Sequence, residues 1–212
     1  MRIYDISLTL SPALPIWPSH LPYEISRARD IERGDRSNVS RIQMTAHTGT
    51  HVDAPLHFIP DGRSVEALDL NVLVGPALVV EALAAEVIDA GLLASLDLPA
   101  ETTRLLFHTR NSGYWASGEP GFREDYVALD ASGAQWIVDH GFRLLGVDYL
   151  SVAAFTDTVT PHRILLGAGV IAVEGLNLTG IESGEYHLAC LPLKVGGSDG
   201  GPCRAVLMRE EG

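Results

Sequence analysis

Four side chains that can bind a metal ion or move a proton lie within eleven residues of one another: His47, His51, Asp53 and His57. One glycine and several β-branched residues separate the first three, which favours an extended backbone over a helix. Side chains of a strand alternate between its two faces, so His47, Gly49, His51 and Asp53 are predicted to share a face. Gly49 would leave a gap there in which an ion could approach the backbone.

Two neutral imidazoles and one carboxylate suit zinc, manganese or iron(II), and three protein ligands leave positions open for water. Two alternatives remain. A helix would also align His47 with His51, at the i, i+4 spacing of the zinc helices of metalloproteases. The run could also be a strand end whose histidines are only hydrogen-bonded core residues.

His57 lies six residues beyond His51 and past Pro55, so it is expected to border the site without joining the strand face. A histidine in such a position suits general acid or base catalysis, in which it delivers a proton to a leaving nitrogen. The alternative is that His57 is a third imidazole ligand.

A second pair of candidate ligands comes later in the chain. His162 follows Pro161 in a predicted short helix, and Glu174 ends the apolar run 170–173. A carboxylate at the end of a buried strand is costly to desolvate unless it is paired, hydrogen-bonded or bound to metal. Spacing alone equally allows a solvated histidine and an ordinary strand-end glutamate.

The elements that must position these residues alternate between strand and helix after the first third of the chain. Hydrophobic periodicity and turn residues predict strands at 3–10, 38–53, 72–81, 104–109, 143–149, 170–174, 186–192 and 204–208. The same patterns predict helices at 86–96, 131–140 and 161–166. This alternation indicates an α/β fold with a mixed sheet, and 212 residues suit one domain over 1–212.

Composition limits the partners. The net charge of −12, from 15 basic and 27 acidic residues, repels phosphate backbones, so no nucleic-acid partner is expected. Two cysteines without CxxC spacing argue against a disulfide scaffold or a thiolate zinc site. The apolar stretch 72–98 is interrupted by charges, and the first residues lack the apolar core of a signal peptide, so we expect a cytoplasmic protein without a membrane partner.

Several motifs in order carry a resemblance to a known family. The run at 47–57 reads H-x-G-T-H-x-D-A-P-x-H, and Trp17-Pro18 precedes it by about thirty residues. Further matches follow at 146–148, at His162 with Glu174-Gly175-Leu176, and at 191–207. Over nearly its whole length the chain resembles the cyclase family of metal-dependent hydrolases, which includes bacterial kynurenine formamidase.

The resemblance implies roles for individual residues. His47, His51 and Asp53 would hold a first metal ion, and Asp53 would bridge to a second ion held by His162 and Glu174. His57 would donate and accept the proton. Trp17, in a proline-rich loop, would be a platform for the substrate; an ordinary core tryptophan is the alternative. The implied cofactor is one or two divalent ions, zinc first and manganese second.

The family fold is a compact α/β domain whose swivelling, barrel-like sheet is flanked by helices, and its members form dimers or tetramers. The implied reaction is hydrolysis of a carbon–nitrogen bond in a small aromatic substrate such as an N-formyl aryl amine. Alternatives are an isatin-like cyclic amide as substrate, or a metal-binding module without catalysis. A proton-transfer residue beside three ligands, His57, favours the enzyme.

The remaining polar candidates have simpler interpretations. Asp148 is expected to be a structural hydrogen-bond acceptor, Cys190 a core residue, and the glycine-rich loop 194–201 a tight loop near the site. The scattered histidines are expected to be surface or structural residues: His20, His108, His140 and His187.

Overall fold

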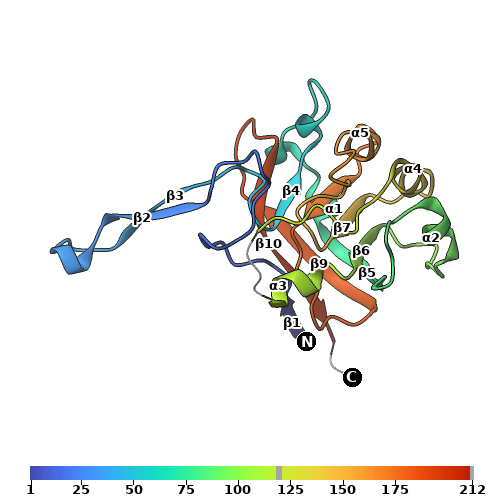
Figure 1. Cartoon of the computed structure of the whole chain (residues 1–212), viewed down its shortest axis with the longest axis horizontal. Helices are drawn as coiled ribbons and strands as arrows, with labels where there is room; N and C mark the ends of the chain where they lie inside the picture. Colours follow the sequence, from blue (N-terminus) through green and yellow to red (C-terminus); the bar gives the residue numbers. More distant parts are fainter. Residues whose placement is uncertain (118–120, 211–212) are drawn as a thin grey trace.

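The computed structural model describes residues 1–117 and 121–210, and its centre is a closed ring of strands (Figure 1). Around the ring the order is β10, β4, β8, β7, β6, β5 and β9, and β9 pairs with β10 again to close it. β1 (Arg2–Asp5) extends the sheet beyond β10. The ring strands are β4 (His51–Asp53), β5 (Val74–Glu81), β6 (Arg104–His108), β7 (Leu144–Val147), β8 (Ile171–Glu174), β9 (Gly184–Pro192) and β10 (Gly200–Arg209).

Strand direction divides the ring into two parts. β5, β6, β7 and β8 run parallel, and the chain crosses between them through helices, as parallel pairing requires. β4, β9 and β10 pair antiparallel with their neighbours. The helices are α1 (Leu70–Leu73), α2 (Ala90–Ser95), α3 (Ser112–Ser117), α4 (Ala131–Asp139) and α5 (Thr160–Gly167). The expected mixed α/β fold with a barrel-like sheet flanked by helices is confirmed.

Two apolar cores explain why β6, β7 and β8 read as continuous apolar runs. One core lies inside the ring and takes Val52 from β4, Leu106 from β6 and Val173 from β8. The other lies between the parallel strands and the helices α2, α4 and α5, and includes Phe107 and Ala172. Strands covered on both faces need apolar residues at every position.

Except for the strand 38–53, the predicted elements are confirmed as helices or strands and corrected at their edges. The predicted strand 3–10 ends at Asp5, and the strand 72–81 begins at Val74 because α1, capped by Asp69, occupies the preceding residues. The predicted helix 86–96 shortens to α2, whose N-cap Asp89 accepts a hydrogen bond from the backbone N–H of Leu92. None of the helices in the described part of the chain has the length and apolar character that a membrane crossing requires.

The predicted strand 38–53 is wrong as a single element. β3 (Val39–Gln43) ends before the histidines and pairs with β2 (Glu24–Arg29) in a separate two-stranded sheet that projects from the ring (Figure 1). The short helix η1 (Ile31–Arg33) forms the tip of this projection. A turn follows β3, and β4 begins only at His51.

Candidate metal centre

His51 and Asp53 lie on the outer face of β4, because Val52 between them points into the ring core. β8 pairs antiparallel with β4, and its residue opposite His51 is Glu174. Cross-strand partners share a face, so an imidazole and two carboxylates come together outside the ring. All three side chains are buried.

His47 reaches the same point from a turn, not from the strand, and the predicted gap at Gly49 is wrong. Gly49 has φ +69°, and a Cβ there would meet Leu10 Cδ2 at 2.6 Å. The glycine is therefore required by a left-handed turn packed on an apolar side chain. Its carbonyl oxygen accepts a hydrogen bond from His51 Nδ1 at 2.9 Å.

His162 comes from α5, which begins at Thr160 and has Pro161 in its first turn. Its Nδ1 donates to the carbonyl oxygen of Thr158 at 2.6 Å. Its Nε2 lies 3.1 Å from Glu174 Oε1 and 3.5 Å from Asp53 Oδ2. The helix, turn and strand between His162 and Glu174 thus fold the two side chains back to one point.

The arrangement of donors fits a bound cation. A carbonyl oxygen can only accept, so Nδ1 of both His51 and His162 carries a proton, and Nε2 is the nitrogen directed at the carboxylates. His51 Nε2 lies 3.4 Å from Asp53 Oδ1 and 3.3 Å from Glu174 Oε2. His51 Nε2 and Asp53 Oδ2 are buried and have no hydrogen-bond partner among the described residues. Buried polar atoms without a partner are costly, and an ion between them would satisfy both.

Two triads of possible ligands share one carboxylate. His47, His51 and Asp53 can offer their ligand atoms to one ion, and Asp53, His162 and Glu174 can offer theirs to another. The five side chains that the sequence singled out as ligands therefore meet at one place. A nitrogen and oxygen donor set of this kind suits zinc or manganese.

The histidines and carboxylates of the cluster stabilise one another's charged forms. Burial opposes protonation of the rings, but the adjacent carboxylates of Asp53 and Glu174 outweigh it and raise the pKa of His51 and of His162 to about 10. Burial likewise opposes ionisation of Asp53, yet the charge of His47 and hydrogen bonds from the histidines hold its pKa well below the usual range. A metal ion binds an imidazole nitrogen only in its unprotonated form, so an ion at this place would compete with a proton for Nε2.

His57 borders this cluster from the short helix η2 (Pro55–His57). Its ring stacks on His47, with ring centroids 3.9 Å apart and planes at 23°. Its Nδ1 lies 3.3 Å from Asp199 Oδ2. Burial is the main cause that lowers the pKa of His57, which favours the neutral ring that can accept a proton.

Asp199 is the residue that sequence reasoning missed. Its Oδ2 also lies 3.0 Å from His47 Nε2, and its carbonyl oxygen accepts from the backbone N–H of Ala54 at 2.9 Å. The glycine-rich loop that carries it does pack against the site, since a Cβ on Gly200 would meet His47 Cε1 at 2.6 Å. The one sequence feature that could have indicated its role is that Asp199 is an isolated carboxylate within a glycine-rich loop.

A cavity opens over the cluster and is lined partly by loops. Trp17 lies on its wall with His20, Phe58 and Leu150, beside His57. Trp17 also packs edge-on against Phe122, with centroids 4.9 Å apart. His20, expected to be a surface or structural residue, therefore faces the cavity, and its Nδ1 lies 3.4 Å from Thr45 Oγ1.

Asp148 has the expected structural environment. It is fully buried and accepts hydrogen bonds from the backbone N–H and the hydroxyl of both Thr109 and Ser112. Cys190 is a buried core residue, as expected. Neither residue lies among the side chains that line the cavity over the metal ligands.

Comparison with known proteins gives one consistent result. The family model described as "Putative cyclase" matches residues 4–154. The chain is 38% identical over 217 residues to "Cyclase-like protein 1" of Arabidopsis thaliana, covering 98% of this chain and 85% of that protein. It is 37% identical over 206 residues to a kynurenine formamidase of Geobacillus thermodenitrificans (strain NG80-2), covering 97% and 96%. A solved structure of a potential metal-dependent hydrolase with cyclase activity is 31% identical, with a TM-score of 0.84 over 99% of both chains.

Proposed function

The chain belongs to the cyclase family, and from this premise we propose that it is a metal-dependent hydrolase of a carbon–nitrogen bond in a small aromatic amide. An N-formyl aryl amine is the substrate class that we propose, by analogy with the relative named kynurenine formamidase. The observation that carries the proposal is the pair of triads that share Asp53, buried except for the half-buried His47, with two polar atoms left without a partner.

The proposed ligands are His47, His51 and Asp53 for one ion, and Asp53, His162 and Glu174 for a second. Zinc is the proposed metal, with manganese as the alternative. When bound, such an ion supplies a water nucleophile that is active near neutral pH and polarises a carbonyl oxygen. The hydrogen bonds from Nδ1 of His51 and His162 to backbone carbonyls fix the rings in the orientation that metal binding needs.

His57 is the proposed proton donor and acceptor. Asp199, 3.3 Å from Nδ1, favours the tautomer that carries its proton on Nδ1 and leaves Nε2 able to accept. A low pKa keeps this ring neutral before the reaction. The proton that Nε2 accepts would then be delivered to the leaving nitrogen.

Trp17 is proposed to stack on the aromatic ring of the substrate, since it lies on the cavity wall beside His57. Packing against Phe122 and Phe155 would hold the indole in place. Trp17→Ala should therefore raise KM for aryl amides more than it lowers kcat, the result expected when uniform binding is lost. Steady-state kinetics would measure this, and unchanged constants would assign Trp17 to packing alone.

The experiment that tests the proposal compares metal content with hydrolysis. Protein reconstituted with zinc or with manganese is assayed on a panel containing N-formylkynurenine, other N-formyl aryl amines and an isatin-like lactam. We expect turnover of at least one aryl amide, its loss after chelation and its recovery on readdition of metal. Full metal binding without turnover of any member would reject the hydrolase and leave a metal-binding module.

A further inference from the structure

His20 lies on the wall of the cavity over the metal cluster, although no group of possible metal ligands among the described residues includes it. A turn places it there, since its backbone N–H donates to the carbonyl oxygen of Trp17 at 2.9 Å. The centroid of its ring lies 6.2 Å from that of His47. His20 is therefore close both to the proposed platform for the substrate ring and to a proposed metal ligand.

One ring nitrogen of His20 has a hydrogen-bond partner and the other has none. Nδ1 lies 3.4 Å from Thr45 Oγ1, which in turn lies 3.0 Å from Thr48 Oγ1. Nε2 has no hydrogen-bond partner among the described residues, and unlike His51 Nε2 it is not fully buried. When the Thr45 hydroxyl donates to Nδ1, the proton of the neutral ring is on Nε2, which can then donate to a molecule in the cavity.

The cavity has room for about one aromatic ring. Its volume is about 140 Å³, and an engineered protein cavity of ~150 Å³ holds one benzene molecule. Apart from the candidate ligands, His57 and the indole of Trp17, its described polar wall consists of His20, Ser151 and Thr158. The last two come from the segment before α5, whereas His20 comes from the same turn as Trp17. A ring stacked on Trp17 would therefore carry its polar substituent close to His20.

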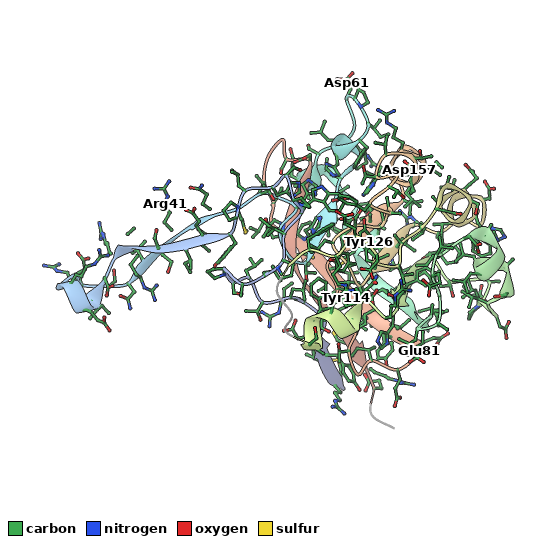
Figure 2. All side chains as sticks on the ribbon, viewed as in Figure 1. Arg41, Asp61, Glu81, Tyr114, Tyr126 and Asp157 are labelled. Atoms are coloured by element: carbon green, nitrogen blue, oxygen red, sulfur yellow. The ribbon has the colours of Figure 1, made fainter. Side chains whose placement is uncertain are left out.

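The charge of the cavity wall indicates what kind of substituent it accepts. Among the residues that the structure describes, no lysine or arginine lines this cavity. The basic residue nearest in sequence to His47 is Arg41, which Figure 2 shows on the two-stranded sheet that projects away from the ring. A carboxylate on the substrate would have no lysine or arginine here with which to pair, and burying an unpaired charge is costly. The wall therefore favours an uncharged substituent.

We propose that His20 is a specificity-determining residue, whose Nε2 donates a hydrogen bond to an uncharged acceptor on the substrate ring, next to the scissile amide. The acceptor lies next to the amide because His20 is close to His47, and the amide has to reach the ion that His47 would bind. A ketone oxygen has the required chemistry. This proposal rests on the proposed hydrolase function and narrows its substrate class to aryl amides of one ring with a neighbouring ketone, of which no charged group is recognised.

A series of related amides tests this on the metal-loaded protein: formanilide, ortho-acetylformanilide, which adds a ketone, and N-formylkynurenine, which adds a charged tail to that ketone. His20→Phe should lower the preference for ortho-acetylformanilide over formanilide, as a ratio of kcat/KM values, by about 5-fold, which corresponds to one neutral hydrogen bond. His20→Gln, whose side-chain amide can donate, should restore the preference. His187→Phe, at an exposed histidine on β9, is the matched control. In the wild type, the tail of N-formylkynurenine should bring no further gain.

Binding without turnover separates this proposal from the proposed function. Calorimetry with ortho-aminoacetophenone and with ortho-ethylaniline, which has a similar shape without the ketone, should show the same loss of preference in His20→Phe, of about 5-fold. If the wild type hydrolyses none of the amides, the hydrolase is rejected and this binding preference alone decides on His20.

Three results would overturn the proposal. The first is an unchanged preference in His20→Phe. The second is a loss of preference that comes with a loss of bound metal, because His20 would then act on the metal site. The third is a wild-type kcat/KM for N-formylkynurenine far above that for ortho-acetylformanilide, because the charged tail would then be recognised.

Discussion

At the scale of single residues, Asp53 has the central place in the site. Its two oxygens face different histidines, Oδ1 toward His47 and His51 and Oδ2 toward His162. Its backbone is fixed as well, since it pairs with Gly200 on one side and with Ala172 on the other. Because it belongs to both triads, its loss should affect every ion that the site binds.

We therefore predict that Asp53→Ala lowers bound metal more than His162→Ala does. The loss in affinity should exceed the ~10–100-fold that removal of an outer-shell partner costs. Elemental analysis and titration calorimetry would measure this, with His187→Ala, an exposed histidine on β9 that belongs to neither triad, as the control. Full occupancy in Asp53→Ala, His47→Ala and His51→Ala alike would contradict the assignment.

His57 gives the sharpest test of catalysis. His57→Ala should keep its metal and near-native stability, because His57 belongs to neither of the two triads that share Asp53. It should nevertheless lose about 10²–10⁴ in kcat on amides, the range expected for general acid–base catalysis. Activated aryl esters, whose leaving group needs no proton, should show a smaller loss.

Metal content decides how a slow His57→Ala variant is interpreted. If the ion is lost with the ring, His57 is a ligand, as its neighbourhood with His47 and Asp199 also allows. If amide hydrolysis proceeds at the native rate, another group carries the proton. Asp199→Asn keeps the shape of the side chain and removes the charge beside both His57 Nδ1 and His47 Nε2, so its metal content has to be measured in the same way.

At the scale of elements, the three-residue strand β4 shows how the backbone can position the proposed metal site. β10 and β8 pair with it on both sides, so its register is set twice. A slip of one residue would move Val52 to the outer face and both ligands into the apolar core. A small substitution that disturbs the backbone next to β4 should therefore lower both the stability of the fold and the affinity for metal.

Gly175, directly after β8, tests this idea. It has φ +68°, and a Cβ there would meet the carbonyl oxygen of Gly49 at 2.3 Å. Gly180 has φ +75° with nothing within 4 Å, so Gly180→Ala should cost only the left-handed penalty of ~1–2 kcal/mol. Gly175→Ala should cost clearly more in urea unfolding and should also lower metal affinity. Equal costs for the two variants would show that the turn at Gly49 can move.

Strands can be predicted from the sequence where one or both of their faces are buried, because burial leaves a regular apolar pattern. Runs covered on both sides became β6, β7 and β8, and alternation correctly brought His51 and Asp53 to one face. The position of His47 could not be predicted, because nothing in the alternating pattern marks the left-handed turn at Gly49, which packs against the distant Leu10.

Asp199 could not be predicted for a related reason, since His47, which its side chain contacts, lies 152 positions earlier in the chain. Only the pairing of β10 with β4 brings its loop to the site. The projecting sheet of β2 and β3 could not be predicted either. The alternating pattern of β3 continues in sequence toward His51, and no local signal marks the end of β3 at Gln43. Long-range pairing, unlike periodicity, leaves little trace in one sequence.

At the scale of the whole molecule, the metal cluster is expected to contribute to stability. Four titratable groups are buried at the junction of β4, β8 and α5, and two of their atoms have no partner. A ligand that binds only the folded state stabilises it by ~2.7 kcal/mol when its free concentration is 100 times Kd. Removing the metal should therefore lower the Tm measured by calorimetry, and readdition should restore it. In Asp53→Ala the chelator should have little further effect.

The described fold also separates two kinds of structural constraint. Strands and one helix hold most of the candidate metal ligands. In contrast, the cavity wall is formed partly by loops: Trp17 and His20 come from the loop before β2, and Leu150 and Thr158 from the segment before α5. Loops can change in length and composition with little effect on the scaffold. The substrate specificity of this fold can thus change in evolution, or be changed by grafting these two loops, while the elements that hold the candidate metal ligands stay the same.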